Sequence, residues 1–215
     1  CKAGIARRTN QEAHIMPNPS TFPLVDEILQ SHAEALGPDL PAYRNHVTRV
    51  LHLVFALAPQ LQTAPEPVLI AGAFHDLGIW TAQTFDYLDP SSQLAHDYLE
   101  AHGQQAFWPE VDLIIQQHHK LRSYRGPFEA SVEAFRRADL VDLSLGWLGD
   151  GLQPEFIELV LGNDKARRAG IILLAGVAGG DHAAFDRPQR TQCFERRVGA
   201  VAFVVIEDRR RPLAL

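Results

Sequence analysis

Residues 70–80 have the sequence IAGAFHDLGIW, an apolar run that ends in an adjacent histidine and aspartate, His75 and Asp76. With Pro67 before the run and Gly78 after it, the pattern predicts a buried helix from residue 68 to about residue 76. A buried carboxylate is costly unless a partner neutralises it. A divalent metal accepts an imidazole nitrogen and a carboxylate oxygen together, so this pair indicates a metal site. Taken alone, the pair is equally well interpreted as a helix-end cap at Gly78.

The sequence around this helix predicts further helices of similar length. Proline and glycine divide it into pieces in which apolar residues recur at spacings of three and four, which is typical of helices. In the fourth piece, Asp89 is expected to cap the helix and Pro90 to occupy its first turn. The predicted helices cover residues 21–36, 41–59, 68–76, 90–103, 109–120, 127–146 and 154–162. The sequence therefore predicts an all-α protein, an antiparallel helical bundle of single-domain size.

Length and composition limit the function classes. The chain has 215 residues, 46% of them hydrophobic, and a formal net charge of −6. Its acidic balance argues against a dedicated nucleic-acid-binding protein. The longest apolar stretch, residues 169–178, is about half as long as a membrane span. Two cysteines form no disulfide framework and we find no secretory signal, so we expect a cytoplasmic protein without a nucleic-acid or membrane partner.

Three parts of the chain differ in character. Residues 1–19 are predicted to be an N-terminal extension, within which Met16 is the only methionine of the sequence. Residues 20–178 are predicted to form the helical domain. Residues 179–215 are rich in arginine, and the β-branched run at 201–206 is compatible with either a strand or a helix.

Other histidines and aspartates fall on apolar helix faces. His46 precedes Val50 by four residues and Leu53 by seven, so it is expected to point inward. A single inward histidine is more often a hydrogen-bonded core residue than a ligand. However, His118 and Asp139 continue the apolar stripes of two further helices in the same way. A bundle core can gather such residues from facing helices into one metal site.

Three assignments stay open at this level. His119 follows Ile115 by four residues and can also turn inward, so either His118 or His119 is the ligand from that helix; the apolar stripe favours His118. The face of His96 is less clear. Asp142 lies one turn after Asp139 and can share its face.

The ordered set of His46, His75-Asp76 and Asp139 resembles the HD superfamily. Its three motifs are similar to YRNHVTRVL (43–51), IAGAFHDLGIW (70–80) and FRRADLVDLSLG (135–146), so the resemblance covers about half of the chain. It implies an HD-type helical bundle in which His46, His75, Asp76 and Asp139 hold a metal.

The extra histidines resemble the subset of that superfamily with further ligands between the His-Asp pair and the last aspartate. This subset includes HD-GYP-type phosphodiesterases, some nucleotide phosphohydrolases, and mixed-valent di-iron oxygenases that cleave phosphonates or myo-inositol. The resemblance implies that Asp76 bridges two metals, that His96 and His118 hold the second, and that Asp76 and His119 are catalytic. The metals would be divalent, one or two per chain, with iron or manganese expected first and cobalt, nickel or zinc as alternatives.

Two departures from the family pattern bear on the substrate. Ile79 and Trp80 occupy the place where many members carry a basic residue shortly after His-Asp-Leu-Gly. The GYP motif is absent after His118-His119, which argues against a cyclic-dinucleotide phosphodiesterase.

We therefore expect a metal-dependent phosphohydrolase that acts on a small phosphorylated molecule or nucleotide. The phosphate would be bound by cations at the mouth of the site, and these are Arg49, Lys120, Arg122 and Arg125. Cations near a helix C-terminus are equally typical of a solvated helix end. The alternatives are a di-iron oxygenase acting on a phosphonate or polyol, and a non-catalytic metal- or ligand-binding module. A homodimer is expected.

Overall fold

The computed structural model describes residues 22–63, 65–84, 86–149 and 151–162. The predicted extension 1–19, the apolar stretch 169–178 and the C-terminal segment 179–215 lie outside them. The described part of the chain is helical and contains no strand, so the predicted all-α bundle is confirmed.

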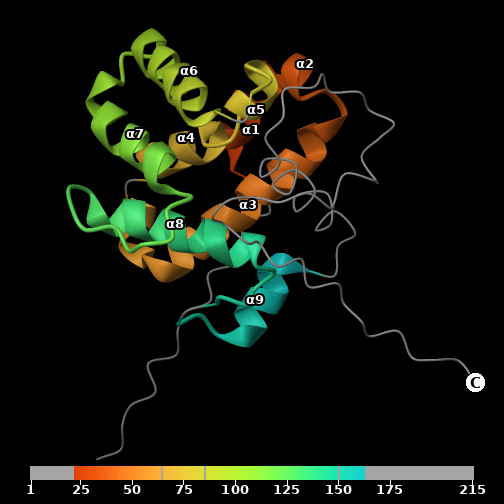
Figure 1. Cartoon of the computed structure of the whole chain (residues 1–215), viewed down its shortest axis with the longest axis vertical. Coiled ribbons are helices and arrows are strands. Elements are labelled where there is room, and N and C mark those ends of the chain that lie inside the picture. Colours follow the sequence, from red (N-terminus) through yellow and green to blue (C-terminus); the bar gives the residue numbers. More distant parts are fainter. Residues whose placement is uncertain (1–21, 64, 85, 150, 163–215) are drawn as a thin grey trace, which may run out of the picture.

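The chain runs through a series of helices joined by short turns (Figure 1). The α-helices are α1 (Pro23–Ser31), α2 (Ala33–Leu36), α3 (Leu40–Leu57), α4 (Glu66–Phe74), α5 (Gly78–Thr81), α6 (Leu88–Ala101), α7 (Trp108–Gln117), α8 (Glu129–Leu143) and α9 (Pro154–Leu161). Three 3₁₀ helices, η1 (Gly37–Asp39), η2 (Pro59–Thr63) and η3 (Gln105–Phe107), connect them.

Proline and glycine set many of these boundaries, as the sequence predicted. A proline lies in the first turn of α1, α3, α4, α7 and α9, where its missing N–H would have no helical partner. Gly37 and Gly162 follow α2 and α9 with positive φ angles of 52° and 58°, a conformation that favours glycine.

Several boundaries differ from the prediction, and two of them show how local side chains change a helix end. The first helix was expected to continue to residue 36, but it breaks at His32. The Ser31 hydroxyl and the His32 ring both hydrogen-bond the Ile28 carbonyl, and such side-chain bonds compete with the next helical turn. Asp89 was expected to cap α6, but the helix begins at Leu88, so Asp89 lies in its first turn and makes no cap.

Helix α4 is the centre of the bundle. It packs against α1, α3, α6 and α7, and most of its residues are buried on all sides. Helix α8 packs across α3 and α7, as Figure 1 shows. The carboxyl end of α4 is therefore enclosed by α3, α7 and α8, and His75 and Asp76 lie there.

None of the helices in the described ranges combines the length and the apolar character that crossing a bilayer requires.

Candidate metal centre

Two helices end at the centre of the bundle, and a histidine follows the last residue of each. His75 directly follows α4 and His118 directly follows α7. The last carbonyls of a helix have no intrahelical partner. In both helices the histidine uses one: Nδ1 of His75 bonds the Gly72 carbonyl at 2.8 Å, and Nδ1 of His118 bonds the Ile115 carbonyl at 2.7 Å. A carbonyl only accepts, so Nδ1 carries the hydrogen, and in the neutral ring Nε2 presents a lone pair to the centre.

His46 reaches the same place from the middle of α3. Its Nδ1 bonds Oδ2 of Asp142 on α8 at 2.8 Å. Burial raises the pKa of Asp142, but hydrogen bonds from His46 and Arg49 lower it to about 2, so the carboxylate is ionised and accepts. His46 therefore also has its hydrogen on Nδ1 and a lone pair on Nε2.

The inward nitrogens lie close together. The Nε2 atoms of His46 and His75 are 3.0 Å apart, and both rings are buried. Two lone pairs repel each other at this distance unless a proton or a cation lies between them. The arrangement is thus poised to bind a positive charge.

Asp76 faces two groups of nitrogens, one with each carboxylate oxygen. Its Oδ2 lies 3.2 Å from Nε2 of His75 and 3.7 Å from Nε2 of His46. Its Oδ1 lies 3.2 Å from Nε2 of His118. His46, His75 and Asp76 form one group of donor atoms, and Asp76, His118 and His119 form another. Either buried group could hold a metal ion.

Asp139 on α8 lies beside the first group, next to His46. Its side chain is 1% exposed, and Oδ1 lies 3.5 Å from Nε2 of His46. Within the described part of the chain this buried oxygen has no hydrogen-bond partner. A buried carboxylate oxygen without a donor is costly, and a metal at the centre would satisfy it.

The separations between donor atoms fit a metal. Bonds of about 2.1 Å place neighbouring ligand atoms about 3.0 Å apart in an octahedral site and about 3.4 Å apart in a tetrahedral one. The four contacts around His46, His75, Asp76 and Asp139 measure 3.0, 3.2, 3.5 and 3.7 Å. His46, His75 and Asp76 therefore fit a divalent ion, and Asp139 lies beside them at His46.

The charges of the metal-free centre are consistent with this interpretation. Burial lowers the pKa of His75, but the neighbouring Asp76 charge raises it to about 9. Burial also raises the pKa of Asp76, yet His75 and His118 hold it well below its usual range. Burial raises the pKa of Asp139. In the metal-free protein a proton on His75 thus supplies part of the positive charge that the site requires.

His119 also lies at the centre, on the side that is more exposed to solvent. Its side chain is 27% exposed, and Nε2 lies 3.7 Å from Oδ2 of Asp139. Its ring contacts the hydroxyl of buried Tyr87, with Nδ1 2.8 Å from that oxygen. Burial lowers the pKa of His119 to about 2, with His118 as a further cause, so the ring is neutral and able to donate a lone pair. The sequence left His118 and His119 as alternatives, and the structure brings both together with Asp76.

His96 does not belong to the centre, contrary to the sequence-based assignment. It is absent from both donor groups of the described residues, and its side chain is 39% exposed. Its ring packs edge-on against Trp108, and Nδ1 lies 3.7 Å from Asp97. The buried face of α6 includes Ala95 and Leu99, and His96 is rotated about 100° from Ala95.

Arg49 was expected to bind substrate phosphate, and the structure gives it another partner. Its Nε and Nη2 donate to the two oxygens of Asp142 at 2.6 and 2.9 Å. A guanidinium engaged in a buried bidentate pair is unavailable to a phosphate at the mouth. The sequence offered no signal for this pair beyond the suggestion that Asp142 shares a face with Asp139.

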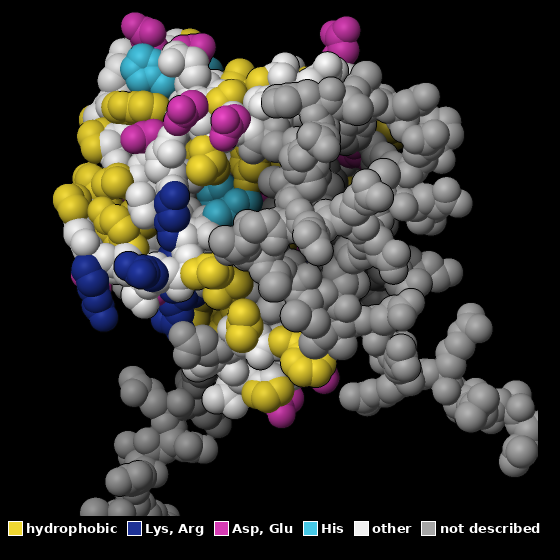
Figure 2. Space-filling view, in the orientation of Figure 1, with side chains coloured by type: hydrophobic (Ala, Val, Ile, Leu, Met, Phe, Trp, Pro, Cys, Tyr) yellow, Lys and Arg dark blue, Asp and Glu magenta, His cyan; other side chains and the backbone are white. Residues whose placement is uncertain are grey.

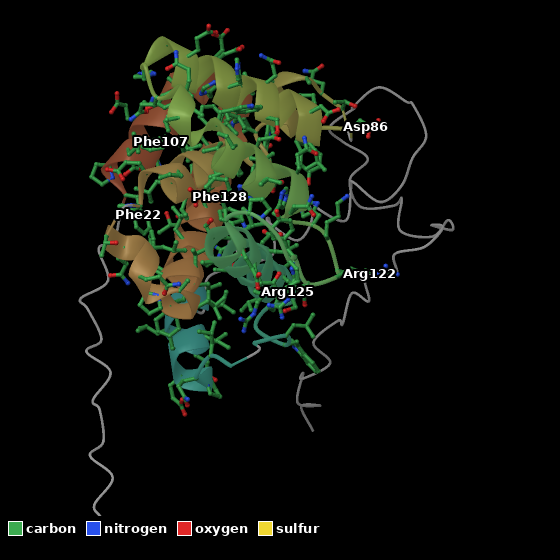
Figure 3. All side chains as sticks on the ribbon, turned by 90° about the vertical axis from the view of Figure 1, so that its left-hand side faces the viewer. Phe22, Asp86, Phe107, Arg122, Arg125 and Phe128 are labelled. Atoms are coloured by element: carbon green, nitrogen blue, oxygen red, sulfur yellow. The ribbon has the colours of Figure 1, made fainter. Side chains whose placement is uncertain are left out.

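The other predicted phosphate ligands lie on the loop that follows His119. Lys120 and Arg122 are exposed, and among the described residues no ion pair is found for either side chain. Arg125 pairs with Glu129 on α8. Figure 3 shows Arg122 and Arg125 on this loop, away from Phe22 and Phe107. In Figure 2, Lys and Arg side chains gather beside a histidine that reaches the surface.

Two tyrosines at the centre were not anticipated. Tyr43 lies one turn before His46; its ring stacks on His46 and makes a tilted contact with Trp80. Its hydroxyl donates to the Ala73 carbonyl and accepts from the backbone N–H of Asp76. Tyr43 is three residues before His46, so helical spacing could have placed both on the same buried face. Tyr87 directly precedes α6, outside the helix, where helical periodicity carries no information.

Comparisons with known proteins return no match, whether with protein-family models, with curated proteins or with solved structures.

Proposed function

We propose that this chain is a metal-dependent phosphohydrolase of the HD type, acting on a small phosphorylated molecule or nucleotide. The proposal rests on three histidines whose Nδ1 atoms are held by hydrogen bonds and whose Nε2 atoms lie near Asp76. The two oxygens of Asp76 face different nitrogen groups. His46, His75, Asp76 and Asp139 would hold one divalent metal. Asp76, His118 and His119 would hold a second.

Such a centre supplies Lewis-acid stabilisation of a phosphoryl oxygen and a water molecule acidified towards neutral pH. The chain's own residues would do the rest. Lys120 and Arg122 extend from the loop beside His119 and would bind the phosphate charge. Tyr87 keeps its proton, because burial raises its pKa, and its hydroxyl can donate a hydrogen bond beside His119. The enclosing core of α3, α4, α7 and α8 would exclude bulk water from the far side.

The test is phosphate release by the full chain, loaded with manganese or iron, from a panel of phosphomonoesters and phosphodiesters. Asp76→Asn should abolish release, because the bridging carboxylate loses a charge and one oxygen. His96→Ala is the matched control, since it removes a histidine outside the centre and should retain activity. Absence of release above a chelator-treated control across the panel would overturn the proposal.

The donor set also favours a second candidate, an oxygenase of the di-iron HD type acting on a phosphonate or polyol. Four imidazoles and two carboxylates suit iron that activates oxygen. Oxygen uptake by iron-loaded, partly reduced protein with candidate phosphonates tests this reaction, and uptake equal to a no-substrate control would exclude it.

A non-catalytic binding module is the third alternative. Loss of the metal would then change the stability of the protein, and no turnover would be found with or without metal.

A further inference from the structure

The three inward histidines are fixed in two different ways. His75 and His118 stand at helix ends and use a free carbonyl three residues earlier in their own helices. His46 lies within the 18-residue helix α3, where the carbonyls of the preceding turn already accept backbone hydrogen bonds. Its Nδ1 hydrogen therefore needs an acceptor from outside the helix.

Asp142 provides that acceptor across the α3–α8 contact. Its two oxygens accept three hydrogen bonds, from Nε and Nη2 of Arg49 and from Nδ1 of His46, at 2.6, 2.9 and 2.8 Å. The Asp142 and Arg49 side chains are only 5% and 12% exposed. With both oxygens engaged, Asp142 is not itself free to bind a metal, although it lies one turn from Asp139.

We propose that Asp142 and Arg49 are positioning residues that keep the hydrogen of His46 on Nδ1 and so reserve Nε2 for a metal. This inference rests on the proposed metal-dependent function. Arg49 orients the carboxylate through its two-pronged contact, and the carboxylate orients the imidazole. A carboxylate behind a histidine also increases the donor strength of the ligating nitrogen, which a neutral carbonyl does less well. His46 is then the most strongly donating histidine of the centre.

The experiment compares Asp142→Asn and Arg49→Met with Arg44→Met in the full chain. Arg44 is the matched control, because it lies two residues before His46, on the opposite face of the same helix. It pairs with Asp26 at 2.8 Å, and both side chains are 34% exposed. An amide offers one acceptor oxygen where the carboxylate offers two. We expect metal affinity, measured by competition with a chromophoric chelator, to fall about 10- to 100-fold in Asp142→Asn. Arg49→Met should shift it in the same direction, and Arg44→Met should leave it unchanged.

A second readout separates positioning from stability alone. Nitrogen NMR of the metal-free, ¹⁵N-histidine-labelled protein reports which ring nitrogen carries the hydrogen. We expect His46 to be protonated on Nδ1 in the wild type and in Arg44→Met, with a mixture of tautomers in Asp142→Asn. If affinity and tautomer stay as in the wild type while only the melting temperature falls, the pair is merely structural and the proposal is overturned.

The readouts also distinguish failure of this inference from failure of the proposed function. If the wild type binds no metal but the tautomer of His46 still depends on Asp142, the metal-dependent function fails and the positioning of His46 stands. If the wild type binds metal and hydrolyses phosphate esters but Asp142→Asn does both equally well, the positioning pair fails and the function stands.

Discussion

At the scale of single residues, the centre is defined by where hydrogens and lone pairs must lie. Nδ1 of each inward histidine is committed to an acceptor oxygen, so every Nε2 is left for the middle of the bundle. Helical spacing placed His46, His118 and Asp139 on apolar stripes. His75 and Asp76 were predicted because the pair ends a buried apolar run. His96 and Arg49 could not be placed in this way, since helix rotation and cross-helix ion pairs depend on how the helices pack.

Metal binding should release a proton from His75. Its pKa of about 9 means that the ring is protonated at neutral pH, and ligation requires the bare Nε2. Metal affinity should therefore rise with pH until about pH 9. Titration calorimetry in two buffers of different ionisation enthalpy measures the release, and we expect about one proton per chain at pH 7.5. Identical heats in both buffers would contradict this assignment.

The raised pKa of His75 also affects the stability of the metal-free fold. Metal affinity should rise with pH, whereas this stability should fall. A folded-state pKa above the ordinary value of 6.5 contributes stability that is fully present below pH 6.5. That contribution is lost as the pH rises through about 9. Chemical denaturation of the metal-free protein should show decreasing stability over this range, and His75→Gln should flatten the dependence.

At the scale of elements, the short helix α5 holds Tyr87 and the start of α6 against the centre. The backbone N–H of Gly78 donates to the Ser91 hydroxyl at 2.9 Å. A Cβ on Gly78 would overlap the Tyr87 carbonyl oxygen and come within 2.9 Å of the Ser91 nitrogen. The sequence marked Gly78 as a helix stop, but the close approach was not predictable, because it depends on a neighbour 13 residues away.

Gly78→Ala should destabilise the protein by about 1–3 kcal/mol, because α5 and α6 must separate to admit the methyl group. Gly72→Ala is the matched control on the other side of the His-Asp pair, where the nearest atoms to the added Cβ belong to the side chain of Leu51, the closest at 3.1 Å. Urea denaturation compares the two. A loss in Gly72→Ala as large as that in Gly78→Ala would show that the α5–α6 contact is not the cause.

At the scale of the whole molecule, the candidate ligands come from four regions of one bundle: α3, the end of α4, the end of α7, and α8. The all-α class was predictable because proline and glycine separate segments of clear helical periodicity. The convergence itself was anticipated only as a resemblance, since sequence periodicity places residues on a face without saying which faces meet. The predicted homodimer stays a prediction.

Because the ligands are distributed in this way, metal should bind the folded chain far better than the unfolded chain. At a free metal concentration 100-fold above Kd, the fold gains about 2.7 kcal/mol. For a domain of this size, that gain corresponds to an increase in Tm of roughly 5–10 °C. Differential scanning fluorimetry with manganese and with chelator measures it. Asp76→Ala should show no metal-dependent increase, and an increase equal to that of the wild type would place the bound metal elsewhere.

In the proposed centre, Asp76 lies between two metal positions built from His46, His75, Asp139, His118 and His119. Elemental analysis of the reconstituted full chain tests it most directly, with Asp76→Ala and His96→Ala prepared in parallel. We expect two metals per chain in the wild type, two in His96→Ala, and none retained in Asp76→Ala. A wild type that binds no metal, or an Asp76→Ala variant that retains the wild-type content, would contradict it.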